Sequence, residues 1–353
     1  HRLSLLLALL VEDRRGTGDF LPRPAKRELP GPPGYHRSMR ALSLALAFGL
    51  ASSPLGCTPA PTPEPPTAPP APPTGEPAAT GEQPGAPEAA LPGAAPAGKP
   101  CGALDCQLFD DPREALAVVL AEGPQVLAVG EAHAQRGAEV ASSTHRFTEQ
   151  PLPLLADSAS DLVIELMIAD GKCGEAEKKT SDAQKPVVEK QAENNQNEFV
   201  ALGNASKARG VQPHVLRPSC DDYQAVAAAG PDGVPRMLEM IARLTDDLVG
   251  RILARNAKEN RERMVLAYGG GGHNDVAPRE GREPWSFGPS LRERTGGHYV
   301  ELDIFVPEFI KESDTWRAFP WYPHYDRATM GDRTVLFRTG EGAYTLIFPL
   351  TKR

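Results

Sequence analysis

The chain has 353 residues, a formal net charge of −8 and 24% charged residues. It contains no basic block and no interleaving of basic with aromatic residues, which argues against nucleic acid as a partner. The length is ample for one folded domain with a sizeable core.

The N-terminal region indicates an export signal. The first methionine is Met39, and the apolar run 41–51 behind it is typical of a secretory signal and too short to span a membrane. The segment ends at Cys57, in a sequence that resembles a bacterial lipoprotein signal, so we expect this cysteine to be lipidated; ordinary cleavage nearby is the alternative. Residues 1–38 are then an upstream extension and are left out of the fold. Because Thr58 rather than Asp follows the cysteine, we expect an outer-membrane lipoprotein that is held to the membrane by its lipid.

Residues 58–100 form a proline-rich segment in which about one residue in three is proline. Such a composition cannot bury enough apolar surface to offset chain entropy, so it predicts a disordered, semi-extended tether. At about 3.1 Å per residue this tether would reach on the order of 130 Å. Residues 101–353 are then expected to form a single domain.

Four cysteines lie in the expected domain, and export would place them where disulfides form. Four cysteines allow three connectivities. We favour one short local bridge and one bridge between the segments that follow two neighbouring strands, which are Cys101–Cys106 and Cys173–Cys220. No C-x-x-C spacing is present, so a zinc–cysteine or thioredoxin-like site has little support.

The first chemical motif follows a short buried strand. A helix over 112–121 leads into the apolar run 126–129, which is typical of a strand buried on both faces of a parallel sheet. Gly130 breaks the run and is followed by Glu131 and His133. Since ligands gather at the carboxyl ends of strands in open α/β sheets, this pair is a candidate site. The alternative is that Glu131 caps the next helix and His133 is a surface residue.

A second predicted strand, 162–166, carries a carboxylate inside an apolar run. It follows a helical region over 137–155. A buried carboxylate must find a cation, a metal or several donors, because leaving it unpaired is costly. The partner of Glu165 is therefore either a structural arginine or the same centre as Glu131 and His133.

A third strand, 211–216, follows a polar helical region over 185–208 that we expect to cover the sheet edge. His214 inside this strand is expected to be a hydrogen-bonded core histidine rather than a ligand. Arg217, at the carboxyl end of the strand, is a candidate anion clamp or partner of Glu165.

An amphipathic helix over 235–256 precedes a fourth strand, 264–268. The strand runs into the glycines 269–272, which allow close approach to a ligand and would present His273 at the same sheet edge as His133. The run is not a P-loop, because the Lys-Ser/Thr ending is absent.

A fifth strand over 299–306 and a β-hairpin over 334–338 and 344–348 complete the pattern. An aromatic-rich loop between them, 316–325, either lines a pocket or closes the core. The predicted fold class is α/β, with a mainly parallel central sheet, helices on both faces and a C-terminal β-hairpin.

Together these motifs resemble those of a known superfamily. Gly130-Glu131-Ala132-His133, Glu165 and Gly270-Gly271-Gly272-His273 are similar to motifs of the group that contains ChaN-type haem-binding lipoproteins, the TraB and Tiki proteins and the erythromycin esterases. The resemblance implies a divalent-metal or acid–base centre formed by Glu131, His133, Glu165 and His273. ChaN-like members imply a lipoprotein that binds haem and takes part in iron acquisition.

Two imidazoles and two carboxylates suit Mn, Fe, Co or Zn and leave room for an activated water. Without a metal, a Glu–His pair could activate water directly. We therefore expect an envelope-anchored hydrolase of peptide or ester bonds; a haem-binding uptake lipoprotein is the alternative. The four side chains are expected to converge, with Arg217 and Asn274 at the border of the cleft. Substrate-binding candidates are Arg136, Arg217, Asn274 and Asp275.

Overall fold

The computed structural model describes residues 4–5, 96–169 and 171–352. The expected signal sequence, the lipidation candidate Cys57 and most of the proline-rich segment lie outside these described residues. Within the described ranges, no helix combines the length and hydropathy needed to cross a bilayer.

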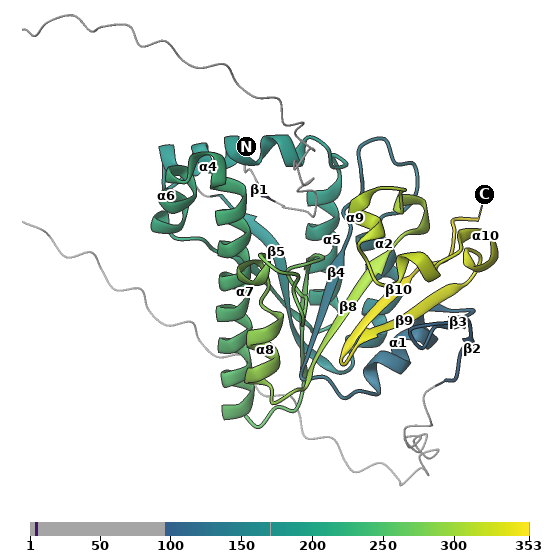
Figure 1. The fold of residues 1–353 in the computed structure, drawn as a ribbon. Helices are drawn as coiled ribbons and strands as arrows, with labels where there is room; N and C mark the ends of the chain where they lie inside the picture. Colours follow the sequence, from purple (N-terminus) through teal and green to yellow (C-terminus); the bar gives the residue numbers. More distant parts are fainter. Residues whose placement is uncertain (1–3, 6–95, 170, 353) are drawn as a thin grey trace, which may run out of the picture. The chain divides into compact units, whose positions relative to one another are not determined.

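The fold is α/β and is built around one mixed, mostly parallel sheet (Figure 1). The strand order is β1-β5-β7-β4-β8-β10-β9-β3-β2, with β6 also paired to β5. The strands are β1 (Ser4–Leu5), β2 (Lys99–Pro100), β3 (Gln107–Phe109), β4 (Val126–Glu131), β5 (Ala159–Ile168), β6 (Gln212–Leu216), β7 (Met264–Gly270), β8 (Tyr299–Phe305), β9 (Thr334–Gly340) and β10 (Ala343–Ile347). Each apolar run that predicted a strand forms one, and the α/β class is confirmed.

Parallel pairing joins the central strands. β5 pairs in parallel with β6 and β7, β4 with β7 and β8, and β10 with β8. Antiparallel pairing occurs at both ends of the sheet, where β9 pairs with β10 and β3, β2 with β3, and β1 with the end of β5. The two residues of β1 belong to the segment that we left out of the predicted fold.

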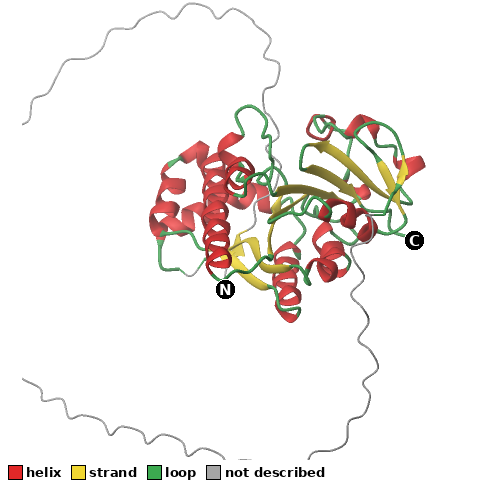
Figure 2. Ribbon diagram, turned by 90° about the horizontal axis from the view of Figure 1, so that it is seen from below, coloured by secondary structure: helices red, strands yellow, loops and turns green. Residues whose placement is uncertain are grey.

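Helices pack on both faces of the sheet (Figure 2). One face is covered by α1 (Pro112–Leu120), α2 (Ser143–Glu149), α3 (Pro151–Leu155) and α5 (Asn195–Ala208), and the other by α7 (Gly233–Lys258) and α8 (Gly288–Arg294). This double cover explains why every residue of β4 and β8 is buried. The other α-helices are α4 (Glu175–Val188), α6 (Cys220–Ala228), α9 (Asp314–Arg317) and α10 (Arg327–Met330).

Two helix predictions differ from the structure, for identifiable reasons. The region 137–155 becomes helical only after Ser142, whose side chain accepts a hydrogen bond from the His145 amide as the N-cap of α2. The region 185–208 is interrupted between α4 and α5, because the Ala192 amide donates to the carbonyl of Ala134 at 2.8 Å. Through this hydrogen bond, the segment between α4 and α5 packs against the loop that contains His133.

Both favoured disulfides are present, Cys101–Cys106 and Cys173–Cys220. The second joins the segment after β5 to the start of α6, directly after β6. Because β5 and β6 are parallel neighbours, their carboxyl ends meet and bring the two cysteines together. The predicted aromatic-rich loop closes a smaller core, in which Trp321 packs on Phe305 and Phe337.

Candidate acid–base site

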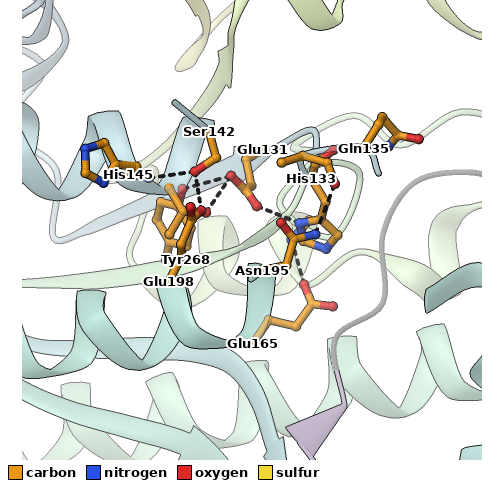
Figure 3. Close-up of polar contacts among 12 residues, drawn as sticks. Glu131, His133, Gln135, Ser142, His145, Glu165, Asn195, Glu198 and Tyr268 are labelled. Carbon is orange, nitrogen blue, oxygen red and sulfur yellow. Dashed lines mark hydrogen bonds and ion pairs between the residues drawn. The ribbon is translucent and has the colours of Figure 1, made fainter. Parts of the chain in front are cut away.

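Glu131 and His133 form a buried pair at the carboxyl end of β4 (Figure 3). Each residue is only 1% exposed, and Glu131 Oε1 lies 2.6 Å from His133 Nδ1. The other oxygen, Oε2, accepts hydrogen bonds from the hydroxyls of Thr144 at 2.8 Å and Tyr268 at 3.2 Å. Both oxygens of Glu131 are thus engaged by the protein. The carboxylate therefore favours the His133 tautomer with the proton on Nδ1 and the lone pair on Nε2.

Aromatic rings fix the position of His133. The ring of Phe199 from α5 meets the imidazole edge to face at 5.7 Å and also contacts Tyr268 at 5.6 Å. The Asn195 side chain donates to the Ala134 carbonyl at 3.2 Å and holds the same loop. Burial, together with the Glu131 charge, raises the pKa of Tyr268 well above its usual value, so its hydroxyl remains a donor. The alternative in which His133 is a surface residue does not describe this structure.

Glu165 and His273 form a second carboxylate–imidazole pair. Glu165 is 4% exposed and His273 5% exposed, and Glu165 Oε1 lies 3.9 Å from His273 Nε2. His273 Nδ1 faces the carbonyl oxygen of Trp285 at 2.6 Å and must donate to it. Burial raises the pKa of Glu165, against the opposing charges of His273 and His133. Glu165 Oε1 is buried and has no hydrogen-bond partner among the described residues.

The glycines at the end of β7 contact both glutamates, Glu165 through its carboxylate and Glu131 through its backbone. The Gly270 amide donates to Glu165 Oε2 at 2.7 Å, and the Gly271 amide donates to the carbonyl of Glu131 at 2.9 Å. A Cβ on Gly269 would lie 2.4 Å from Glu165 Oε2. Glycine therefore permits the Glu165 side chain, rather than a ligand, to approach the backbone closely here.

The structure thus brings the four predicted residues to one edge of the sheet as two pairs. Glu131 ends β4, His133 follows it, and His273 follows the neighbouring strand β7. Glu165 lies on β5, the other neighbour of β7, and its described ion-pair partner is His273 rather than an arginine.

The residues expected to bind substrate have contacts of their own. Asn274 is buried and donates to Asp303 at 3.0 Å. Arg136 is exposed and lies 3.9 Å from Glu193 Oε1. Arg217 is exposed and lines a groove outside β6. Asp275 belongs to a separate group of carboxylates.

That group is an acidic cluster of Asp275, Glu301 and Asp303, which sequence reasoning missed. Their ligand atoms lie within 4.8 Å of one another, and no other group of three or more such residues is found in the described part of the chain. Burial and mutual repulsion raise the pKa of Glu301 to about 9 and that of Asp303 to about 7. The signal was present, because Glu301 and Asp303 are carboxylates two residues apart in an apolar strand and so lie on one face.

A transition metal held by the four predicted ligands does not fit these contacts. Both oxygens of Glu131 already bind protein donors. The other three residues, His133, Glu165 and His273, do not bring their ligand atoms within 4.8 Å of one another. Ligands of one zinc ion at about 2.0–2.3 Å would be closer than this. The acidic cluster offers only oxygen atoms, which suit hard cations such as Mg, Ca or Mn.

Comparison with family models finds no match, and none is found among curated proteins. Among solved structures, "The structure of the type III effector HopBA1" is similar at a TM-score of 0.34 and 10% identity. The similarity covers 68% of this chain and 94% of that one. A likeness this remote carries no argument about function.

Proposed function

We propose that the domain is a hydrolase of peptide or ester bonds that works by acid–base catalysis with its two Glu–His pairs. The observation that supports this most is the buried 2.6 Å contact between Glu131 and His133 at the carboxyl end of a parallel strand. A carboxylate that orients an imidazole is the arrangement by which histidine acts as a general base.

Different roles follow from the different surroundings of the two pairs. In the proposal, His133 takes a proton from water, while Glu131 holds the ring and stabilises the imidazolium. Glu165, whose pKa is raised by burial, retains a proton and gives it to the leaving group. The Gly270 amide engages Oε2 of Glu165, and His273 lies beside the other oxygen, Oε1. No step is assigned to a metal.

The proposal keeps the other expectations from the sequence. It includes an exported, outer-membrane lipoprotein, with which the two disulfides are compatible. It also includes the fold expected from the sequence, a mainly parallel core followed by a C-terminal β-hairpin. Two observations support this fold: β9 and β10 pair antiparallel, and β10 pairs in parallel with β8. The haem alternative receives no support from Tyr268, which is buried and donates to Glu131.

The test is hydrolysis of p-nitrophenyl esters and of labelled casein by the full chain, with and without EDTA. Glu131→Gln keeps an oxygen for the His133 proton but removes the charge, so we expect kcat to fall by about 10²–10⁴-fold. Glu280→Gln, at an exposed glutamate, is the matched control and should leave kcat unchanged.

Three results would contradict the proposal. The first is Glu131→Gln activity within twofold of the parent. The second is activity that EDTA abolishes and added metal restores. The third is absence of hydrolysis together with a Soret band on haem titration, which would favour the uptake protein instead.

A further inference from the structure

A groove runs along the outer side of β6. Within the described part of the chain β6 pairs only with β5, and α5 and α7 both contact it. These helices cover opposite faces of the sheet, and both contribute residues to the lining of the groove. The groove has a volume of about 450 Å³. This size lies within the range of roughly 300–1,000 Å³ that small-molecule sites occupy.

Most of the residues that line the groove have apolar side chains, and some of these are almost wholly buried. Val200 of α5 is 46% exposed and is one of the few large apolar side chains that the described surface leaves open. The other large apolar side chains that line the groove are Ile164, Leu166, Phe199, Val215, Leu216, Leu244 and Leu248. An apolar surface left open beside a sheet edge indicates a site that an apolar ligand could cover.

Two arginines give the groove its charge. Arg217 and Arg251 are exposed and line it, and no aspartate or glutamate is among its lining residues. Neither arginine makes an ion pair or a side-chain hydrogen bond with any residue that the structure describes. Arg255, one turn further along α7, shows the contrast, since it binds Asp161 at 2.5 Å. The two groove arginines are therefore available to an anion.

The edge itself is poorly suited to an added peptide strand. Pro213, the second residue of β6, has no backbone N–H to offer. Its carbonyl accepts a hydrogen bond from the Gln212 side chain at 3.1 Å. A ligand held by apolar and ionic contacts fits the groove better than a main-chain ladder does.

We propose that this groove binds a free fatty acid of medium chain length. The acyl chain lies along the wall formed by β5, α5 and α7, and the carboxylate lies between Arg217 and Arg251. The groove borders the candidate active site, because Phe199 lines it and also packs against the His133 ring. The binding does not depend on the proposed hydrolytic activity.

The experiment is calorimetric titration of the full chain with octanoate, decanoate and dodecanoate below their micellar concentrations. Each added methylene should tighten binding roughly fourfold at most, the amount expected for complete burial of one CH₂ group. Decanol, which has the same chain length and no charge, should bind at least tenfold more weakly than decanoate.

Variants then separate the two parts of the site. The double variant Arg217→Gln/Arg251→Gln should weaken decanoate at least tenfold and leave decanol unchanged. Val200→Glu should weaken both ligands. Arg209→Gln removes an exposed arginine near the end of α5 that does not line the groove, and is the matched control. Saturable binding that is unaffected by the double variant, binding independent of chain length, or no binding at all would overturn the proposal.

Discussion

Glu301→Gln should stabilise the domain as the pH rises. Burial, with repulsion from Asp303 and Asp275, raises the pKa of Glu301 from its ordinary 4.5 to about 9. A carboxyl whose pKa is higher in the folded state contributes its stability at low pH and loses it as the pH rises towards the folded value. Between the ordinary and the folded pKa, each pH unit lowers the free energy of unfolding by about 1.4 kcal/mol. From about pH 5 to about pH 8, the free energy of unfolding therefore falls by roughly 4 kcal/mol.

Glutamine removes this penalty and keeps an oxygen that can accept from the Val276 amide, which now donates to Glu301 at 2.6 Å. Because the penalty is shared with the neighbouring carboxylates, we expect Glu301→Gln to gain about 2–4 kcal/mol over the parent between about pH 5 and about pH 8. Urea unfolding at several pH values measures this, with EDTA present so that no cation offsets the repulsion. Glu280→Gln, at an exposed site, should show no such gain. Parallel pH profiles for the parent and Glu301→Gln would refute the reasoning.

Three further outcomes test the fold. Replacing both cysteines of the Cys173–Cys220 disulfide by serine should lower the free energy of unfolding by roughly 4 kcal/mol, because the bridge closes a loop of sequence separation 47. In this variant, a reductant should cause no further loss of stability through the Cys173–Cys220 bridge, because that bridge is already absent. Gly269→Ala should cost about 1–3 kcal/mol by overpacking against a buried carboxylate, whereas Gly340→Ala, whose Cβ would make an ordinary 3.6 Å contact, should be near neutral in the same urea assay. Although burial opposes it, hydrogen bonds from neighbouring side chains lower the pKa of Asp161 to about 2, so Asp161→Asn should lose about 2 kcal/mol at neutral pH and progressively less as the pH falls from about 4 to about 2.

Much of the sheet could be predicted because its strands are buried on both faces. Such strands appear in the sequence as continuous apolar runs, and a charged residue inside one is conspicuous, as at Glu165. The same reasoning applied to Glu301 and Asp303 would have indicated two of the three carboxylates of the acidic cluster; Asp275 lies in a loop. The strand was predicted, but the prediction did not include that its two carboxylates lie on the same face of the sheet.

The partners of the site residues could not be predicted, because they depend on tertiary placement. Thr144 reaches Glu131 from α2, and Tyr268 reaches it from β7 through the register of the parallel pair. The carbonyl of Ala134 interrupts the polar helical region by accepting from Ala192, and local propensity contains no sign of this contact. The local sequence thus indicated which polar residues would be buried and need partners. The tertiary packing determines which partners they have.

Two glycines near the carboxyl ends of β4 and β7, Gly130 and Gly269, have a common physical explanation in this packing. A Cβ on Gly130 would lie 2.4 Å from Asn274 Oδ1 and 2.5 Å from Asp303 Oδ1. A Cβ on Gly269 would meet Glu165 at a similar distance. Neither glycine has a positive φ, so neither is required by the backbone conformation. Each glycine instead leaves the space that a buried polar side chain of another strand or loop occupies. Buried polar side chains packed against the ends of these two strands therefore leave room only for glycine at both positions.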